Sequence, residues 1–317
     1  MNKIFIGPMS KPIVDSILEF EDPAVLIPSR RQVDFNGGYV NNWNTESFAA
    51  YVKSKNKNAV ICRDHAGASQ GQIEDDGYES LSKDCLHFDM IHIDPWKKYM
   101  NIEDGLNETV SMIKFCLKIN SKIKFEIGTE QSIKFFDTST LKYFCDKVYA
   151  ELKKDFDSIS HIVIQSGTAL QGNNQIGQYD KERLIEMSEI AKLYDKLSKE
   201  HNGDYIDSKV IQEKFGLGLD SINIAPEFGF IQTNTILAKL DDEMFETFWK
   251  ICFDSKKWVK WVNPEFDPFK QKKDLIQICG HYVFSNSDFI ENIYNKFDFE
   301  TDIKKAVKNK IEELNIL

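Results

Sequence analysis

The sequence has no long hydrophobic run and no excess of basic residues. No stretch approaches the ~20 apolar residues that a membrane-spanning helix needs, and the apolar run near the N-terminus is too short for a signal peptide. The net charge of −10 at pH 7 argues against a general nucleic-acid-binding protein, because such proteins cluster Lys and Arg to neutralise phosphates. A local basic pocket for a small phosphate is still compatible with this charge. We therefore expect a cytoplasmic protein that binds neither membranes nor nucleic acids.

Two families of motif are also missing. The six cysteines form no CxxC pair and no zinc-knuckle spacing, so reduced thiols are expected. No GxGxxG follows the first predicted strand, which disfavours a dinucleotide-binding, doubly wound sheet.

The sequence does contain a regular alternation of apolar, β-prone segments with amphipathic helical ones. Strands are predicted at residues 3–6, 24–27, 58–63, 88–93, 122–127, 161–165, 196–199 and 220–224. Polar or glycine-rich loops follow them. This pattern predicts an α/β protein of the (β/α)8 TIM-barrel class over residues 1–240, with an open doubly wound sheet as the second interpretation.

Residues 241–317 break the alternation. They are rich in Lys, Asp, Phe and Trp and end in a charged helical segment, so we predict a helical C-terminal extension packed on the barrel. Thr45 is the expected N-cap of a helix over 45–54. The strand at 196–199 is the weakest, and a long helix predicted over 183–200 overlaps with it.

Ionisable and polar residues stand at the ends of the predicted strands. In a barrel the carboxyl ends of the strands share one face, where catalytic residues collect. Imidazole and carboxylate ligands favour zinc, manganese or iron, so the set predicts a divalent-metal site. The residues are Arg30, Arg31, Asp64, His65, His92, Asp94, Glu126, Glu130, Gln165, Gly167, Thr168, His201, Asp204, Asn223 and Glu227.

The stretch from Val60 to Gly71 is central to this prediction. It begins apolar, ends in Arg63, Asp64 and His65, and opens into a Gly/Ala/Ser loop. Strand alternation should turn one of Asp64 and His65 inward and the other away. A metal ligand beside a general acid/base is one interpretation, and a salt bridge with Arg63 is the other.

Three further residues also allow two interpretations. His92 and Asp94 are two apart on one strand and should face the same side, either in the pocket or as a buried His bonded to a carboxylate. Glu126 lies in an apolar strand, where its carboxylate needs either a metal or a basic partner. His201 follows a charged segment and is either a metal ligand or part of an exposed loop.

Phosphate binding has its own candidates. The backbone around Gly167 and Thr168, and the junction 223–227, offer N–H groups that could cradle a phosphate. Arg30 or Arg31 is the candidate anchor for a phosphate or carboxylate.

Taken together in order, several motifs resemble a known family. They are Arg63-Asp64-His65 with Gly67, Ile91 to Asp94, Glu126 to Glu130, Gln165 to Thr168, Glu200-His201 with Asp204-Tyr205, Ile222 to Pro226, and Ser285 to Asp288. The chain resembles the accessory (non-catalytic) subunit family of class II tagatose-bisphosphate aldolase, which is similar to the class II metal-dependent ketose-bisphosphate aldolases.

This resemblance implies roles for individual residues. It makes Asp64 the catalytic acid/base, His65 and His201 zinc ligands, and Asn223 a substrate contact. The family's aldolases place another zinc-binding His after a Gly-Thr pair, where this chain has Leu170, which binds no metal. The third ligand is then expected at His92 or Glu126, or metal binding is weak or absent.

We therefore expect a metal-dependent enzyme of the aldolase type that cleaves a phosphorylated ketose or related sugar acid. The cofactor is a divalent metal, zinc by preference. Asp64, Glu126 and Asp94 are the catalytic candidates; His65, His201 and His92 are the metal ligands; Arg30, Arg31, Gly167, Thr168, Asn223 and Asp204 are the substrate contacts. The alternatives are a ketose-phosphate or keto-acid epimerase that uses the same retro-aldol chemistry, and a non-catalytic subunit that stabilises an aldolase partner. An aldolase subunit or a second copy of the chain is the expected protein partner.

Overall fold

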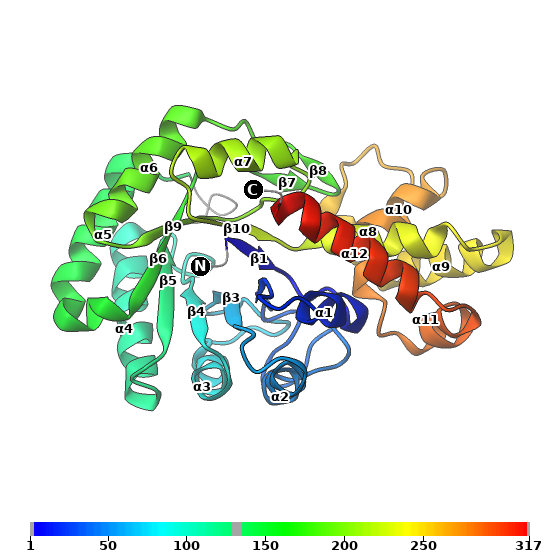
Figure 1. Ribbon diagram of the computed structural model, residues 1–317, viewed down its shortest axis with the longest axis horizontal. Coiled ribbons are helices and arrows are strands. Elements are labelled where there is room, and N and C mark those ends of the chain that lie inside the picture. The colour runs from blue at the N-terminus through cyan, green and yellow to red at the C-terminus, as the bar shows by residue number, and fades with distance from the viewer. Residues whose placement is uncertain (1–2, 129–134, 316–317) are drawn as a thin grey trace.

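The computed structural model describes residues 3–128 and 135–315, and eight parallel strands in this part of the chain form one curved sheet. The order in the sheet is β2-β1-β10-β9-β6-β5-β4-β3, and single bridges from Leu26 to Ile61 and from Ser29 to Asp64 join the two edges. The strands are β1 (Ile4–Ile6), β2 (Val25–Leu26), β3 (Cys62–Ala66), β4 (Met90–Ile93), β5 (Lys124–Gly128), β6 (Ile159–Ile164), β9 (Leu197–Glu200) and β10 (Ser221–Ile224). The predicted (β/α)8 barrel is confirmed (Figure 1).

Helices return the chain from the end of one strand to the start of the next and surround the sheet (Figure 1). Those of the barrel are α1 (Lys11–Leu18), α2 (Thr45–Lys55), α3 (Tyr78–His87), α4 (Ile102–Ile119), α5 (Thr138–Leu152), α6 (Lys181–Leu193), α7 (Ser208–Gly216) and α8 (Pro226–Leu237). A short antiparallel hairpin, β7 (Leu170–Gln171) with β8 (Asn174–Gln175), lies in the connection from β6 to α6 and was not predicted.

Two local predictions differ from the structure. Asn44, not Thr45, is the N-cap of α2. Its side-chain oxygen accepts the backbone N–H of Ser47, and the Ser47 hydroxyl oxygen accepts the backbone N–H of Asn44. The helix predicted over 183–200 ends at Leu193, and Asp195 follows with a φ of 56°. This left-handed residue ends the helix and frees the chain to enter β9, as the predicted seventh strand requires.

The residues after 240 form helices, as the sequence indicates. They are α9 (Asp242–Ser255), α10 (Lys272–Cys279), α11 (Ser287–Asn292) and α12 (Glu300–Asn315), with 3-10 turns η2 (Val259–Trp261), η3 (Gly280–Tyr282) and η4 (Tyr294–Lys296) between them. Helix α12 packs against α1 and α8, so the end of the described chain lies beside its beginning. Buried hydrophobic residues of this segment, such as Phe248 and Leu275, belong to the same core cluster as those of the barrel.

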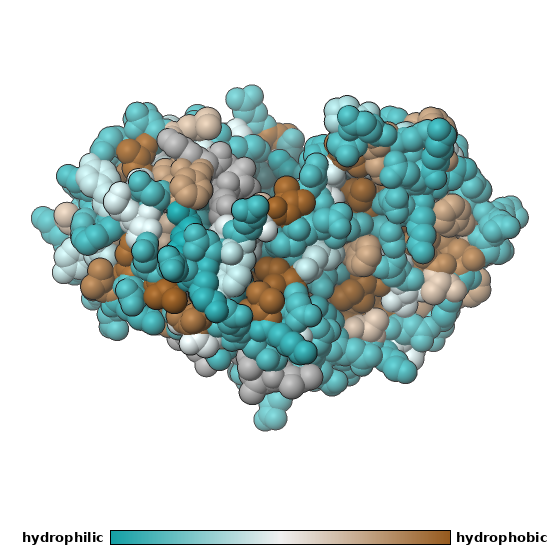
Figure 2. Space-filling view, turned by 90° about the horizontal axis from the view of Figure 1, so that it is seen from above, coloured by the Kyte–Doolittle hydropathy of each residue, from teal (hydrophilic) through white to brown (hydrophobic). Residues whose placement is uncertain are grey.

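The surface is mixed in character. On the face shown in Figure 2, hydrophobic residues lie in separate patches among hydrophilic ones. Among the helices of the described residues, none has both the length and the hydrophobicity needed to cross a membrane. All six cysteines are buried and free.

Candidate metal centre

A bulge in β3 brings two adjacent ionisable residues into one site. The pairing of β3 with β4 shifts register between Arg63 and Ala66, and His65 adopts a left-handed φ of 50°. Such a backbone is strained for a residue other than glycine and recurs at functional sites. The bulge cancels strand alternation, so Asp64 and His65 both contribute to the same cluster. The expectation that one of them turns away is wrong for this reason.

Two further histidines complete the cluster. His92 comes from β4 and His201 directly follows β9, and both side chains are buried. The centroid of the His92 ring lies 4.7 Å from that of His201 and 5.2 Å from that of His65. Asp64, His65, His92 and His201 each offer one ligand atom, and these atoms all lie within 4.8 Å of one another. Three chain-distant strand ends thus supply the candidate metal-site residues.

A carboxylate orients His65. The Nδ1–H of His65 donates to Asp94 Oδ2 at 2.8 Å, which leaves the Nε2 atom on the side of Asp64, 3.7 Å from Oδ2 of that residue. Gln70 Nε2 donates to the same oxygen of Asp94 at 2.6 Å. Carboxylates that fix the tautomer and the orientation of a histidine in this way are common around metal ligands. Asp94 is thus bonded to His65, and the catalytic role that the sequence indicated for it stays a prediction.

The donor set fits a divalent metal ion. Burial, followed by the neighbouring imidazoles of His201 and His65, holds the pKa of His92 well below its usual value, so its ring is neutral, as metal ligation requires. Ligand atoms bonded at about 2.0–2.1 Å to a tetrahedral ion lie about 3.3 Å apart, so the observed atoms need only small side-chain rotations to close around it. Three imidazoles and one carboxylate suit zinc and other first-row metals.

Asn223 contacts this cluster from β10. Its Nδ2 donates to Asp64 Oδ1 at 3.2 Å, while its Oδ1 is buried without a hydrogen-bond partner among the described residues. The bond fixes the carboxylate of Asp64, and the remaining amide oxygen is available for a ligand group.

Glu126 is paired with a lysine deeper in the barrel. Lys199 Nζ lies 2.6 Å from Glu126 Oε1, both side chains are buried, and Lys199 also sits 3.5 Å from the ring centroid of Phe5. Burial raises the pKa of Glu126, but the charges of Lys199 and His161 outweigh it, so the pKa lies below its usual value. The basic partner considered for Glu126 is therefore observed, Glu126 is not among the four clustered residues, and its catalytic role stays a prediction.

The buried carboxylate of Asp204 accepts hydrogen bonds from the backbone. Its Oδ1 accepts the N–H groups of Ala225 and Glu227 at 2.9 and 2.8 Å, at the start of α8. Burial raises the pKa of this carboxyl to about 8, against the effect of those two bonds. The residue is only 2% exposed, and its predicted contact with a substrate stays a prediction.

The candidate phosphate cradle at Gly167 and Thr168 is folded onto its neighbours. A Cβ atom at Gly167 would lie 2.0 Å from the carbonyl oxygen of Gln178. Thr168 Oγ1 lies 3.1 Å from both Glu200 Oε1 and the carbonyl oxygen of His201. These contacts serve the packing of the loop between β6 and α6.

Arg30 and Arg31 are neighbours with opposite surroundings. Arg30 is fully buried, pairs with Asp34 and Asp75 at 2.9 and 2.5 Å, and donates to the carbonyl oxygen of Gly67 at 2.7 Å. Arg31 is exposed. Arg30 has no surface left for a ligand, so the predicted anion anchor rests on Arg31 alone.

Three remaining predictions concern neighbours of the site. Arg63 pairs with Asp84 at 2.6 Å, which removes it as the salt-bridge partner of Asp64 or His65. Leu170 lies in the hairpin, paired in register with Gln175, and offers no ligand atom. Thr129 and Glu130 lie outside the described residues.

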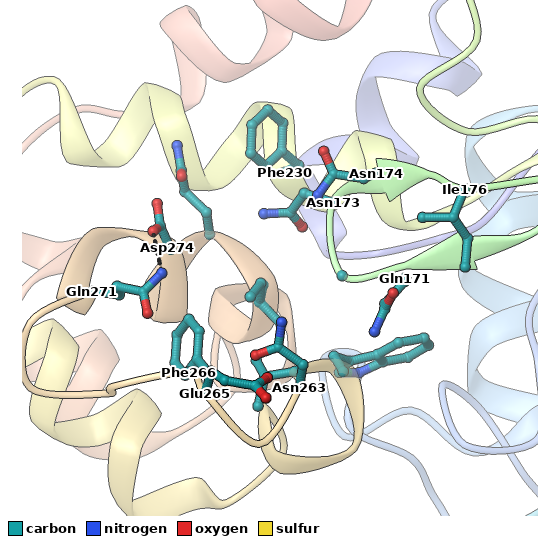
Figure 3. A pocket seen from close by; sticks show the side chains of 15 residues that line it. Gln171, Asn173, Asn174, Ile176, Phe230, Asn263, Glu265, Phe266, Gln271 and Asp274 are labelled. Atoms are coloured by element: carbon teal, nitrogen blue, oxygen red, sulfur yellow. Dashed lines mark hydrogen bonds between the residues drawn. The ribbon is translucent and has the colours of Figure 1, made fainter.

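The structure also contains a cavity that is lined by none of the predicted site residues. We call it the amide-lined cavity; its volume is about 630 Å³. Gln171, Asn173 and Asn174 of the hairpin face Asn263, Glu265 and Phe266 of the C-terminal segment across it (Figure 3). Two carboxylates and no Lys or Arg line it, so it is no candidate for binding an anion.

Comparisons with known proteins support the fold and do not assign a family or an activity. No protein-family model matches the sequence, and no curated protein does. A probable tagatose 6 phosphate kinase from Sinorhizobium meliloti 1021 is similar in structure, with a TM-score of 0.79 and 12% identity over 99% of each chain. A fructuronate-tagaturonate epimerase from Cohnella laeviribosi follows with a TM-score of 0.63 and 11% identity over 99% of this chain and 81% of that one. A fructose-bisphosphate aldolase from Campylobacter jejuni has a TM-score of 0.59 and 14% identity over 100% of this chain and 90% of that one. At such identities the likeness shows the barrel fold alone.

The sequence interpretation missed two residues of the site. Gln70 reaches Asp94 only because the loop after β3 turns back, and nothing in the sequence indicates that turn. Lys199 could have been found, because it stands two residues before His201 in a predicted strand and must share its face.

Proposed function

We propose that this protein is a metal-dependent enzyme that cleaves a carbon–carbon bond of a phosphorylated ketose or related sugar acid by a retro-aldol reaction. The observation that carries the proposal is the convergence of Asp64, His65, His92 and His201, whose ligand atoms lie within 4.8 Å at the carboxyl ends of three strands. The fold similarity to a solved aldolase and a solved sugar epimerase is consistent with it.

The imidazoles of His65, His92 and His201 would hold the ion. When bound, a divalent ion supplies a Lewis acid that polarises the carbonyl of the ketose. Asp94 and Gln70 keep His65 in place for this purpose. The cluster reaches three imidazoles without a ligand at position 170, which supports an active centre over an accessory role.

Asp64 moves the proton in this proposal. Its carboxylate removes the proton from the hydroxyl group on the carbon beside the bond to be broken. The oxygen then forms the carbonyl of the departing aldehyde, the carbon–carbon bond breaks, and its electron pair passes to the fragment that carried the ketone. That fragment takes up a proton before release. Asn223 holds Asp64 in position through its 3.2 Å bond.

The same residues can serve an epimerase. If the two fragments stay bound and the aldehyde turns over, re-formation of the bond gives the epimer at the hydroxyl carbon. The chemistry at Asp64 is then identical, and only the fate of the fragments differs. The likeness to an epimerase in fold is the reason to keep this second candidate.

The test is turnover by the full chain alone, loaded with zinc, on a panel of ketose phosphates and sugar acids. Appearance of a triose or another aldehyde identifies an aldolase, and appearance of an epimer without free fragments identifies an epimerase. No turnover and no bound metal in the purified chain would refute both enzyme functions and leave the accessory subunit.

A further inference from the structure

A second cavity of about 470 Å³ lies where the barrel loops meet the C-terminal segment. We call it the basic pocket. The loop after β2 contributes Arg31 and Tyr39, and the C-terminal segment contributes Lys256, Lys257, Lys260 and Tyr282. No residue of this pocket belongs to the metal centre, and the residues after 240 supply more than half of the side chains named here.

The basic pocket concentrates positive charge in an acidic protein. None of its four cations forms an ion pair with a carboxylate among the described residues, although the chain has 50 acidic residues and 40 basic ones. Lys260 as a whole is exposed, but its ammonium group is partly buried and lies near other positive charges. Burial, with the charges of Arg31, Lys257 and Lys97, lowers the pKa of Lys260 to about 8. Like charges that line one pocket repel one another, and a bound anion would relieve that repulsion.

The walls of the pocket are tied together. Ser285 Oγ donates to the carbonyl oxygen of Tyr39 at 2.8 Å and accepts the N–H of Asn41 at 2.7 Å, so the C-terminal segment clamps the loop after β2. The rings of Tyr39 and Tyr282 meet edge to face with centroids 4.9 Å apart. These contacts connect the C-terminal wall of the pocket to the loop that carries Arg31.

One loop lines the barrel side of the pocket and also contacts the candidate metal centre. Gly71 and Gln72 line the pocket and directly follow Gln70, which bonds the Asp94 carboxylate that orients His65. Lys97, three residues after Asp94, donates to the carbonyl oxygen of Ser69 in the same loop. One loop, residues 66–72, thus connects the metal ligand to the cation cluster.

We propose that the basic pocket binds a phosphoryl group of the substrate as a dianion, and that the C-terminal segment determines specificity by supplying most of the cations. A dianion matches several unpaired cations better than a single carboxylate does, and Arg with Lys is a frequent phosphate-binding combination. This inference rests on the proposed function for the identity of the substrate, but not for anion binding itself.

The first test titrates inorganic phosphate into the full-length, zinc-loaded protein by calorimetry. Arg31→Gln and Lys260→Gln each remove one cation, and Lys273→Gln is the matched control, an exposed lysine in α10 that does not line the pocket. We expect each of the first two to weaken phosphate binding about tenfold and Lys273→Gln to leave it unchanged. Equal affinity in all four proteins, or an equal loss in the Lys273 variant, overturns the proposal.

The second test separates the source of the anion. KM is compared between wild type and Arg31→Gln on a ketose phosphate, on the same ketose without phosphate, and on a uronate. A rise in KM confined to the phosphorylated ketose supports the proposal, and an equal rise on the uronate, or no rise on any of the three, contradicts it. Phosphate binding that depends on Arg31 in a chain without turnover refutes the enzyme function but not the pocket, so the two failures are distinguishable.

Discussion

Two cavities border the segment 256–282 of the C-terminal extension. They differ in the charge of their lining residues and in whether a loop beside the candidate metal centre lines them. Arg31, Lys256, Lys257 and Lys260 line the basic pocket, and cations are its only charged groups. Amide side chains with Glu265 and Asp274 line the amide-lined cavity, which has no cation. The two share a boundary, because Lys260 lies 4.2 Å from the ring centroid of Trp261, which lines the amide-lined cavity.

Size would favour the amide-lined cavity as the substrate site, whereas our proposal selects the basic pocket by its charge and its neighbours. The amide-lined cavity is the larger of the two, yet only the basic pocket is lined by the loop that follows His65, a candidate metal ligand. The hairpin beside the larger cavity does touch the site region, since Gln175 donates to the carbonyl oxygen of Asn202 at 2.9 Å. That contact is a side-chain-to-backbone hydrogen bond and places no charged group beside the site. The two cavities should therefore respond differently to substitution.

Removal of a metal ligand should have the largest effect, because both the ion and the chemistry depend on it. We expect His201→Ala to lose bound zinc and to lower kcat/KM by at least about 100-fold. Elemental analysis and turnover on a ketose phosphate measure this. The matched control is His87→Ala in the last turn of α3, which should keep full metal content. Equal metal content in both variants would contradict the assignment of His201.

Loss of the residue that orients His65 should have the next largest effect. Asp94→Asn keeps the size of the side chain but removes the charge that favours the Nδ1–H tautomer of His65. Zinc affinity should fall about 10- to 100-fold, measured by competition with a chelator, while the fold stays intact. An unchanged affinity would mean that Asp94 plays no part in metal binding.

The two cavities are compared directly by one substitution in each. Arg31→Gln should raise KM for a ketose phosphate about tenfold with a smaller change in kcat, because the residue holds a charge distant from the bond that breaks. Asn173→Ala, in the hairpin wall of the amide-lined cavity, should change KM less than about twofold. The reverse ranking in steady-state kinetics would assign the substrate to the larger cavity.

The smallest effect is a pH dependence of anion binding. The pKa of Lys260 is about 8, and the groups that face its ammonium are the cations Arg31, Lys257 and Lys97 and the rings of Trp261 and Tyr282. Lys260 loses its charge as pH rises through 8, while a phosphate ester stays a dianion above about pH 7. Affinity for a ketose monophosphate should fall a few-fold between pH 7 and 9. Lys260→Gln should flatten the profile, and an unchanged slope in that variant would assign the titration to another group.

The sequence predicted the fold well because hydrophobic periodicity and strand ends depend on local patterns. Apolar runs such as Phe125 and Ile127 around Glu126 mark strands that are buried on both faces. The order of those strands then placed His65, His92 and His201 at one end of the barrel. The shared direction of the parallel strands explains this success, because their carboxyl ends meet at one face of a barrel.

The sequence did not predict the details of the site, because they depend on tertiary contacts. The bulge at His65 departs from alternation, and no local pattern announces it. Arg30 and Arg31 are adjacent and identical, yet their surroundings differ because Asp75, far along the chain, pairs with only one of them. The basic pocket combines residues more than 200 positions apart, which no spacing rule captures.

The metal assignment is tested most directly by anomalous diffraction at the zinc edge from crystals of the full chain grown with zinc. The account predicts one strong peak within about 2.0–2.1 Å of a ring nitrogen of His65, His92 and His201. If no peak lies among these three rings, or if the zinc peak is bound by other residues, the metal centre is contradicted and with it the proposed retro-aldol chemistry.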